Sequence, residues 1–419
     1  MKRIVILGAG TGGTILANTL SRKLSGWNIT IIDKSQQHIY QPGLLFIPFR
    51  LHGYEESGDV SQPIRKPLPD SVDFVSAEVT GIDYSANKVE TTAGEFGYDW
   101  LILAMGCRVD PTAIEGLSEA MGRSAHTFYE LEGALALQKA LDGFKEGKLV
   151  LNIAEMPIKC PVAPIEFVFM ADYYLNLKGI REAAEVEMVT PLTGAFTKPV
   201  ASAALNDIAA AKNIKITPNF ETASVDHEKK VITSFSGEKV EYDILASIPP
   251  NVGPEVIDDS GLGNGAGYAL TDPHTLKSKK ADNIYVLGDN TDVPTSKAGS
   301  VAHFEAEVVE ANILREISGQ APHPDFDGHS NCFIESGYGK ALLIDFNYEI
   351  EPLPGNFPLA KIGPFSLLKE TRLNHWGKLA FKQVYWNLLL TGHLPGDPLL
   401  PAAMSLEGKD VSLLSQKRH

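Results

Sequence analysis

The chain lacks features that define several classes of protein. Three cysteines in 419 residues are too few for a disulfide framework. No apolar run reaches the roughly 20 residues that a membrane-spanning helix needs. Basic residues are in the minority, at 37 Lys and Arg against 52 Asp and Glu, so the formal net charge is −15. Nucleic acid is therefore not an expected partner, because phosphate binding requires a basic face.

The composition also lacks the bias of a disordered chain. Charged residues make up 21% and hydrophobic residues 44%, which are ordinary values for a folded protein. At roughly 150 residues per domain, the length predicts two or three domains. The N-terminus runs directly into a strand-like segment without a separate apolar stretch and cleavage site, so we expect no signal peptide.

The first motif is a dinucleotide-binding pattern at the N-terminus. Residues 3–8 form a β-branched run typical of a buried parallel strand. The glycines of G-x-G-x-x-G follow at once, namely Gly8, Gly10 and Gly13. After a helical segment over 14–23, a second strand over 28–32 leads to Asp33. In this fingerprint backbone N–H groups face a pyrophosphate and the acid accepts a ribose hydroxyl. The pattern alone is compatible with NAD and with FAD.

Two later segments favour FAD. The apolar segment 98–106 closes with Gly106, and the segment 281–289 ends in Gly-Asp. They resemble the A-T-G and G-D motifs of flavoproteins with two dinucleotide-binding domains, although Met105 replaces the threonine of the first motif. In that family the G-D aspartate binds the ribityl chain of FAD, so the resemblance assigns this role to Asp289.

Glycine is missing where a second, nicotinamide-binding fingerprint is expected. The strand-like segment 148–154 is followed by residues 155–166, which contain three prolines and no glycine. Without glycines the backbone cannot close on a pyrophosphate, and the prolines remove N–H donors. Helical and strand patterns nevertheless continue to alternate as far as residue 248. We predict a Rossmann-like fold without nicotinamide binding, so that the electrons come from another donor.

One cysteine lies in the segment that replaces this fingerprint. Cys160 lies where a nicotinamide would meet a flavin, and Cys332 lies 172 positions further on, so the two can meet only through the fold. A free cysteine is often a small buried hydrophobe, and we favour that interpretation for Cys107. For Cys160 the flanking prolines and the position favour a chemical role.

At these segments the sequence resembles sulfide:quinone oxidoreductase and the flavoprotein subunit of flavocytochrome c sulfide dehydrogenase. The resemblance covers nearly the whole chain, and it rests on the three glycines, residues 38–48, 159–166 and 297–299, Gly288-Asp289 and Cys332-Phe333. It implies an α/β fold with two Rossmann-like dinucleotide-binding domains, as in glutathione reductase, and a C-terminal membrane-docking region. The implied boundaries are 1–110 and 266–320 for the FAD-binding domain, 111–265 for the second domain and 321–419 for the C-terminal region.

The resemblance implies thiol chemistry. Hydrosulfide attacks a disulfide or polysulfide bridge by thiol–disulfide exchange, and the released thiolate passes two electrons to FAD. By resemblance Cys332 faces the flavin and Cys160 carries the growing sulfur chain, while the cysteine attacked first stays open. We expect a nearby cation, Lys159 or Lys297, to lower the thiolate pKa from about 8.5. Glu166 fits two interpretations equally, a proton acceptor for hydrosulfide and a carboxylate favoured by a helix N-terminus.

The resemblance also implies how FAD is held. The residues expected at FAD are Gly8, Gly10, Gly13, Asp33, Lys34, Gly106, Gly288, Asp289, Lys297 and Gly299. The loop Tyr40-Gln-Pro-Gly43 lacks the cysteine that attaches FAD covalently in the flavocytochrome subunit, so we predict non-covalent FAD. Several members of the family carry a further cysteine between the counterparts of Cys107 and Cys160. Its absence here leaves His126 without an assigned role, and no metal is predicted.

The C-terminal region carries a helical pattern from His375 to Thr391 with a wide apolar face. Its narrow polar stripe consists of Lys378, Lys382, Gln383 and Asn387. Five basic residues and one acid lie between Lys361 and Asn387, and Gly392 and Pro395 mark the stop. A wide apolar face most often packs on a core, but Trp and Tyr beside lysines are typical of a membrane interface. We predict a monotopic protein on the plasma membrane, with the cytoplasmic face favoured.

By resemblance the quinone contacts Phe333 and a Lys-x-x-Phe pattern, here Lys378 and Phe381. An aromatic slot with one cation stabilises the oxyanion that develops as the ring is reduced. We therefore predict an enzyme that oxidises sulfide and reduces quinone, with a lipid surface and a homo-oligomer among its expected partners. The alternatives are a sulfide dehydrogenase that reduces cytochrome c, a non-catalytic flavoprotein, and a type II NADH:quinone oxidoreductase, which requires the glycines missing after Ala154.

Overall fold

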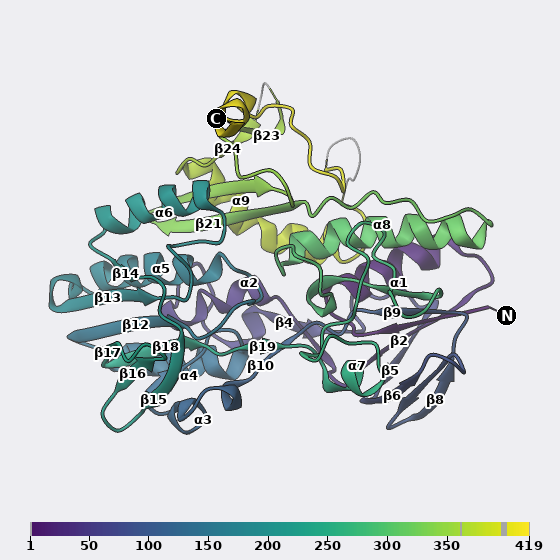
Figure 1. Ribbon diagram of the computed structural model, residues 1–419, viewed down its shortest axis with the longest axis horizontal. Coiled ribbons are helices and arrows are strands. Elements are labelled where there is room, and N and C mark those ends of the chain that lie inside the picture. Colours follow the sequence, from purple (N-terminus) through teal and green to yellow (C-terminus); the bar gives the residue numbers. More distant parts are fainter. Residues whose placement is uncertain (1, 361–362, 395–399, 419) are drawn as a thin grey trace.

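The computed structural model describes residues 2–360, 363–394 and 400–418. Its first parallel sheet lies on the right of Figure 1 and has the strand order β20-β9-β1-β2-β5. The strands are β1 (Arg3–Leu7), β2 (Asn28–Asp33), β5 (Val72–Ser76), β9 (Trp100–Leu103) and β20 (Ile284–Val286). All neighbours pair in parallel, so the motifs that follow β1, β9 and β20 meet at one edge of the sheet.

The second parallel sheet lies on the left of Figure 1 and has the order β11-β18-β12-β13-β14. Its strands are β11 (Ala125–His126), β12 (Gly147–Ile153), β13 (Ala184–Val189), β14 (Lys215–Thr217) and β18 (Ile244–Ile248). The crossover helices include α5 (Ala163–Leu177) and α6 (Pro199–Ala211). The prediction of an α/β fold with two Rossmann-like sheets is confirmed, although the second sheet lacks the glycine fingerprint.

One predicted strand belongs elsewhere. The segment 231–235 was expected to continue the α/β alternation, but β16 (Val231–Ser234) pairs antiparallel with β15 (Thr222–Asp226) and β17 (Lys239–Glu241). Short turns join these strands, and a connection of that length allows only antiparallel neighbours. A similar three-stranded sheet, β6 (Val79–Asp83), β7 (Lys88–Thr91) and β8 (Gly94–Gly97), accompanies the first domain.

The C-terminal region lies along the top of Figure 1. It contains the antiparallel hairpin β21 (Ser330–Gly337) and β22 (Lys340–Phe346), the pair β23 (Gly355–Leu359) and β24 (Gly363–Leu367), and α9 (Arg372–Val384). The helix begins before the predicted residue 375 because the Thr371 hydroxyl caps it, accepting from the Asn374 N–H at 3.0 Å. A π-helical turn over Tyr385–Leu389 follows.

The predicted polar stripe of this helix does not form a single water-facing surface. Lys378 turns inward to a buried carboxylate, and the Lys382 ammonium lies 4.5 Å from the centre of the Tyr54 ring. The exposed face carries apolar side chains instead, including Leu373 and Trp376, which are 56% and 64% exposed. Lys361 and Pro395 lie outside the described residues.

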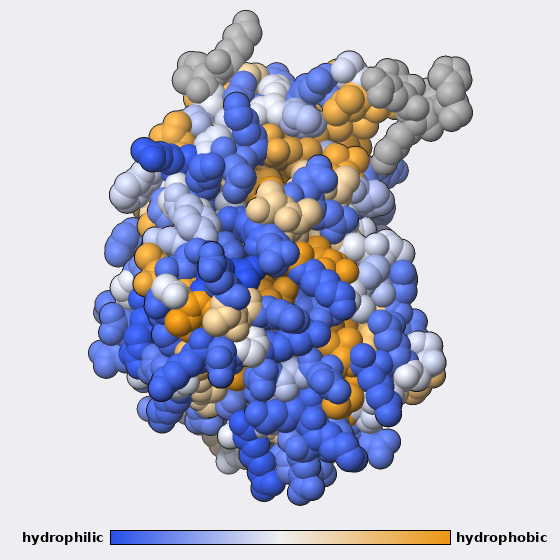
Figure 2. Space-filling model, turned by 90° about the vertical axis from the view of Figure 1, so that its left-hand side faces the viewer, coloured by the Kyte–Doolittle hydropathy of each residue, from blue (hydrophilic) through white to orange (hydrophobic). Residues whose placement is uncertain are grey.

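No described helix is both long enough and apolar enough to cross a membrane. Figure 2 shows hydrophobic surface near the top of the molecule, toward the C-terminal region, and further small patches lower down.

Candidate functional site

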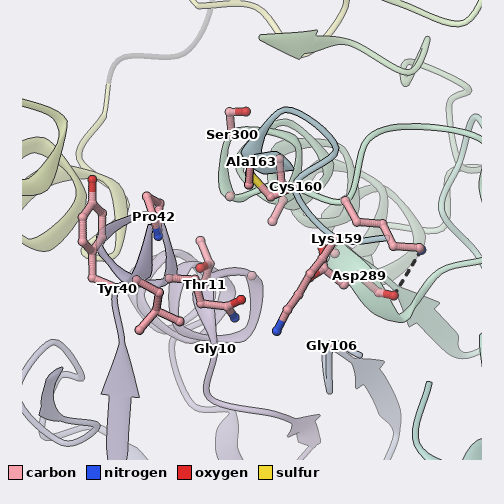
Figure 3. Close-up of a pocket in the computed structure, with 18 of the residues that line it drawn as sticks. Gly10, Thr11, Tyr40, Pro42, Gly106, Lys159, Cys160, Ala163, Asp289 and Ser300 are labelled. Atoms are coloured by element: carbon pink, nitrogen blue, oxygen red, sulfur yellow. Dashed lines mark hydrogen bonds between the residues drawn. The ribbon is translucent and has the colours of Figure 1, made fainter. Parts of the chain in front are cut away.

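A cavity of about 340 Å³ opens where the ends of both sheets meet the C-terminal region. In Figure 3, Gly10 and Thr11 lie on one side of it, and Cys160, Lys159 and Asp289 lie on the other. The predicted site residues that line the cavity are Gly8, Gly10, Asp33, Gly106, Cys160, Glu166, Gly288, Asp289, Lys297, Gly299, Cys332, Phe333, Lys378 and Phe381. Gly13 and Lys34 do not line it.

The glycine loop between β1 and α1 (Thr11–Lys23) has the shape of a phosphate cradle. A Cβ on Gly13 would lie 1.9 Å from the Gly8 carbonyl oxygen, so this glycine serves close packing within the loop. A Cβ on Gly10 would meet no protein atom within 4 Å, so space is open beside the backbone. These residues therefore fit the pyrophosphate of a dinucleotide.

Two predicted cofactor residues differ in their surroundings. The Asp33 carboxylate accepts from the Ala9 N–H at 2.7 Å and stabilises the glycine loop at the end of β2. Lys34, one residue later, points away. Its ammonium pairs with Glu78 at 3.2 Å, and its side chain is 74% exposed. The structure thus gives Lys34 no contact with the cavity, because alternate residues beyond a strand face opposite sides.

Cys160 adopts an unusual backbone conformation for a residue with a side chain. Its φ is +48°, in the left-handed region that favours glycine. Its N–H donates to the Lys297 carbonyl at 2.6 Å, and its carbonyl accepts from the Ala163 N–H at 2.9 Å and the Tyr129 hydroxyl at 3.1 Å. These bonds hold the strained conformation against its cost of about 1–3 kcal/mol. Tyr129 was missed in the sequence because nothing in its local pattern distinguishes it from a core aromatic.

Cys332 reaches the same cavity from the middle of β21, opposite Ile344 of β22. All three cysteines carry free thiols in the structure. The pKa of Cys160 is raised to about 12, mainly by burial and also by the Glu166 carboxylate, while the Lys378 ammonium opposes the rise. Burial likewise raises the pKa of Cys332 well above its usual range, and the neighbouring Cys160 adds to the rise. The fold has therefore brought the two distant cysteines together.

The structure adds Lys378 to the candidate cations, Lys159 and Lys297. The Lys378 ammonium opposes the rise in the pKa of both Cys160 and Cys332, and burial outweighs it. The Lys297 ammonium donates to the backbone carbonyls of Asp289 at 3.1 Å and Thr291 at 2.7 Å. Because the Lys297 ammonium donates to carbonyls of its own loop, it mainly stabilises the conformation of that loop.

Cys107 also lines the cavity, which sequence reasoning did not expect of it. Its Sγ lies 3.8 Å from the Asn251 side-chain oxygen and 4.0 Å from an Asp289 carboxylate oxygen. Burial raises its pKa to about 12. The sequence did contain a signal for this position, because Cys107 directly follows Gly106 at the edge of the sheet where the carboxyl ends of the strands lie. His126, in β11, does not line the cavity.

Glu166 forms a buried ion pair with Lys378 and is itself only 1% exposed. The same carboxylate accepts from the Glu335 N–H at 2.6 Å, and Lys378 also donates to the Phe333 carbonyl at 3.1 Å. Burial raises the pKa of Glu166 even though the Lys378 ammonium opposes the rise. The pair joins α5, β21 and α9 at the wall of the cavity.

Aromatic rings form one end of the cavity beside this ion pair. The rings of Phe333 and Phe365 meet edge to face at 5.2 Å between centres. A Cβ on Gly377 would lie 2.5 Å from Phe365 and 2.9 Å from Phe333, so α9 approaches these rings only because that position is glycine. Phe381 and Tyr385 lie one turn apart and also line the cavity. Gly377, Phe365 and Tyr385 were not identified from the sequence, because their partners are distant in the chain.

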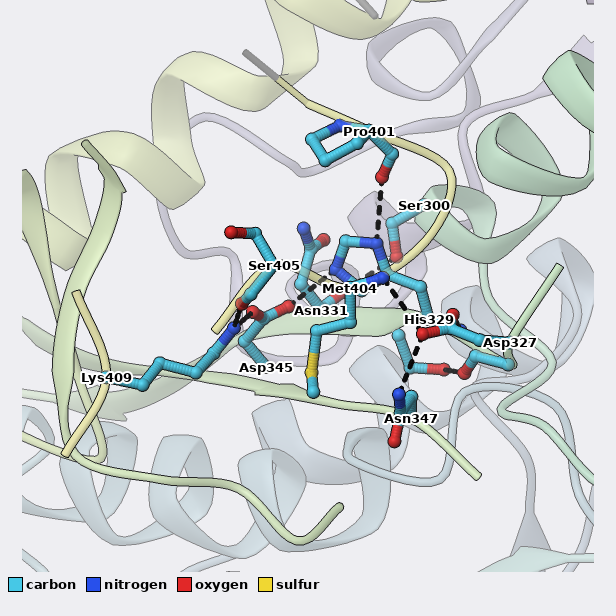
Figure 4. Close-up of polar contacts among 12 residues, drawn as sticks. Ser300, Asp327, His329, Asn331, Asp345, Asn347, Pro401, Met404, Ser405 and Lys409 are labelled. Carbon is cyan, nitrogen blue, oxygen red and sulfur yellow. Dashed lines mark hydrogen bonds and ion pairs between the residues drawn. The ribbon is translucent and has the colours of Figure 1, made fainter. Parts of the chain in front are cut away.

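The back of the Cys332 hairpin is held by a buried polar network (Figure 4). Asp345, which lies opposite Asn331 in the hairpin, accepts from His329 at 2.7 Å and pairs with the Lys409 ammonium at 2.6 Å. His329 also contacts the Pro401 carbonyl at 3.1 Å. The segment around residues 401–409 therefore packs against the hairpin that carries Cys332 and stabilises it.

Comparisons with known proteins agree with the fold. Residues 2–148 match the family model of the pyridine nucleotide-disulphide oxidoreductases. Over nearly its whole length the chain is similar to the sulfide:quinone oxidoreductases, as the sequence predicted. It is 27% identical over 406 residues to the mitochondrial sulfide:quinone oxidoreductase of Mus musculus, across 95% of this chain and 88% of the relative.

A solved structure shares the fold, and a second kind of relative is also similar to the chain. The X-ray structure of sulfide:quinone oxidoreductase from Aquifex aeolicus matches with a TM-score of 0.79 at 22% identity, over 94% of this chain and 93% of that chain. The type II NADH:quinone oxidoreductase of Staphylococcus aureus is 26% identical over 382 residues, covering 82% of this chain and 90% of the relative.

Proposed function

We propose that the protein is an FAD-dependent enzyme that oxidises sulfide to sulfur or polysulfide and reduces a membrane quinone. The observation that carries this proposal is the convergence of Cys160 and Cys332 on one cavity that also holds the glycine loop. The segment before α5 meanwhile lacks the glycines that a nicotinamide dinucleotide needs. The names of the relatives over nearly the whole chain support the same substrates.

The cysteine pair performs the sulfur chemistry. Hydrosulfide attacks the bridged pair, one sulfur–sulfur bond forms and one breaks, and the products are a persulfide on Cys160 and a thiolate on Cys332. The two electrons that leave sulfide stay in this persulfide and thiolate. FAD, when bound, would supply the two-electron acceptor, and the pair would then close as a bridge that is one sulfur longer and release one proton. Lys378 opposes the rise of both thiol pKa values, so it favours the thiolate that this step releases.

The aromatic end of the cavity receives the quinone. Phe333 and Phe381 provide ring surfaces for the quinone head, and the Lys378 ammonium donates to the Glu166 carboxylate and the Phe333 carbonyl at the same cavity. A cation at this position stabilises the negative charge that develops on a quinone oxygen during reduction. Because the cation is buried and already bonded, it needs little reorganisation when the charge appears.

FAD is held without a covalent bond. The loop around α2 (Gln41–Leu44), which lines the cavity, contains no cysteine, and the polar groups expected at FAD come from the glycine loop, Asp33 and Asp289. Acid precipitation of the protein should release all of the flavin into the supernatant. Flavin that stays in the pellet would contradict non-covalent binding.

The exposed side of α9 docks on a lipid surface. Leu373, Trp376 and Leu388 are exposed there, with Lys369 and Arg372 nearby in the chain. Interfacial helices combine such apolar side chains with basic ones that meet anionic headgroups. Sedimentation with anionic vesicles should be lost in Leu373→Ser/Trp376→Ser, while the flavin content of this variant stays normal. The membrane would lie close to the aromatic end of the cavity, where a lipid-soluble acceptor enters.

Absorbance of the flavin under anaerobic conditions tests the function. Sulfide should bleach the flavin band within one turnover, NADH should not, and added quinone should restore it. The matched comparison is cytochrome c in place of quinone, which should leave the band bleached. Bleaching by NADH, or bleaching by sulfide that quinone cannot reverse, would contradict the proposal.

A further inference from the structure

A buried cluster of three titratable side chains lies behind the aromatic end of the cavity. It consists of His52, Glu335 and His375, and none of the three lines the cavity itself. The carboxylate oxygens of Glu335 accept from Nδ1 of His375 at 2.8 and 3.0 Å, and the two residues are 0% and 7% exposed. One polar atom from each of the three residues lies within 4.8 Å of the others.

The cluster adjoins the Glu166–Lys378 pair. The N–H of Glu335 donates to the Glu166 carboxylate at 2.6 Å, and that carboxylate is the ion-pair partner of Lys378. His375 precedes Lys378 by three residues on α9, so both side chains lie on the same side of the helix. Lys378 does line the cavity, and the Glu335 carboxylate acts on its charge and helps to raise its pKa, so Lys378 connects the cluster with the quinone end of the cavity.

The third member, His52, is partly exposed. It is half-buried, whereas its two partners are buried, and its ring lies edge-on to that of His375 with 5.3 Å between centres. Its Nε2 is buried and has no hydrogen-bond partner among the described residues. Burial lowers the pKa of His52, Glu335 opposes the shift, and His375 and Lys378 add to it. An imidazole with an unbonded ring nitrogen beside a buried carboxylate can accept a proton and pass it on.

We propose that His52, His375 and Glu335 relay protons from solvent to Lys378 while quinone is reduced, which rests on the proposed function. The overall reaction is hydrosulfide plus quinone plus one proton, giving protein-bound sulfane sulfur and quinol, so at least one proton comes from solution. Lys378 gives its proton to the reduced quinone oxygen and becomes a neutral amine. The cluster returns a proton to that amine, and His52 takes the replacement from water.

The same three ligand types also occur in metal sites. Their ligand atoms lie within 4.8 Å of one another. The His375 nitrogen that faces Glu335 is, however, already hydrogen-bonded to that carboxylate. A direct bond between an imidazole and a buried carboxylate suits proton transfer better than ion binding.

The test separates the two halves of the turnover in the full-length holoenzyme. Stopped-flow absorbance follows bleaching by sulfide and then recovery on mixing with quinone, for the wild type, His52→Ala and Glu335→Gln. We expect unchanged bleaching, recovery slowed by about tenfold or more, and a larger solvent deuterium isotope effect on recovery. Imidazole in the buffer should restore recovery in His52→Ala, because it replaces the missing proton carrier and would not repair a purely structural defect.

The controls keep each outcome decisive. His227→Ala, in the turn between β15 and β16, is the matched histidine control and should behave as the wild type. If Glu335→Gln fails to bind flavin, His52→Ala alone tests the relay. The His52 side chain is only half-buried, so we expect its removal to leave the fold intact. Normal recovery in His52→Ala, slowed recovery that imidazole does not restore, or a chelator effect on the wild type would each overturn the relay. If sulfide does not bleach the wild type, the proposed function fails, and recovery after dithionite reduction still tests the relay.

Discussion

Two loops occupy equivalent places in the two parallel sheets and have opposite chemistry. The loop from β1 to α1 carries glycines, with Gly8 at φ +98° and open space beside Gly10. The loop from β12 to α5 has prolines, and its residue in the left-handed region is Cys160, at φ +48°. The first loop leaves open space beside its backbone, as a phosphate cradle requires. The second loop, at the same place between strand and helix, carries the Cys160 sulfur at the cavity instead.

The loops also differ in how they are fastened. The Ala9 carbonyl of the first loop accepts from Nδ1 of His38 at 2.9 Å, and Nε2 of His38 accepts from the Tyr385 hydroxyl at 2.6 Å. The Cys160 carbonyl of the second loop accepts from the Tyr129 hydroxyl. A titratable ring thus ties the first loop to the C-terminal region, whereas the second loop depends on a neutral hydroxyl. A dinucleotide-binding fold can therefore carry a cysteine where a cofactor site is expected. Hydrogen bonds then hold the loop in a conformation that glycine would adopt without strain.

The largest effect is expected from removing either sulfur. Cys160→Ser and Cys332→Ser should slow bleaching of the flavin by sulfide by about 10³-fold or more, because an alcohol cannot take part in sulfur exchange. Flavin content should stay normal, since the first loop holds the cofactor. Stopped-flow absorbance and the ratio of flavin to protein check both statements. Wild-type bleaching in either variant would show that the sulfur atom removed from it does not carry the chemistry.

The next largest effect is expected from adding a side chain to the glycine loop between β1 and α1. Gly13→Ala should lose most of the bound flavin and about 3 kcal/mol of folding free energy, because its Cβ would lie 1.9 Å from the Gly8 carbonyl oxygen. Gly10→Ala is the matched variant. Its Cβ meets no protein atom, so only flavin affinity should fall. Urea unfolding and flavin content separate the two effects. Equal stability loss in both variants would contradict the assignment of Gly10 to ligand space.

Much of this comparison could be predicted from the sequence, because both loops are local. The run before Gly8, the acid at Asp33 and the prolines around Cys160 mark strand, turn and helix within a few residues. The pairing of Glu166 with Lys378, the inward turn of Lys382 and the role of Gly377 could not be predicted. They depend on contacts between segments about 200 positions or more apart, or on which face of α9 meets the core. The raised thiol pKa values also depend on burial, which the sequence pattern does not report.

A smaller effect should appear in acid. Burial lowers the pKa of His38 to about 4, from an ordinary value of 6.5. The unfolded chain then binds more protons than the native one between pH 6.5 and 4, so stability falls as the pH drops through this window. From pH 7 to 5 the loss attributable to His38 is about 2 kcal/mol. His38→Gln should show a correspondingly smaller loss by urea unfolding, and His227→Gln should not. An unchanged slope in His38→Gln would mean that another group governs the acid response.

The smallest effect concerns the fastening of the second loop. Tyr129→Phe removes the hydroxyl that donates to the Cys160 carbonyl but keeps the ring in place. One neutral hydrogen bond contributes about 1 kcal/mol, so bleaching by sulfide should slow about fivefold as Cys160 leaves its left-handed conformation more often. Flavin content and recovery with quinone should not change, because neither depends on this loop. Phe128→Leu, at the adjacent ring, is the packing control. If that variant slows bleaching as much as Tyr129→Phe does, packing rather than the hydroxyl holds the sulfur.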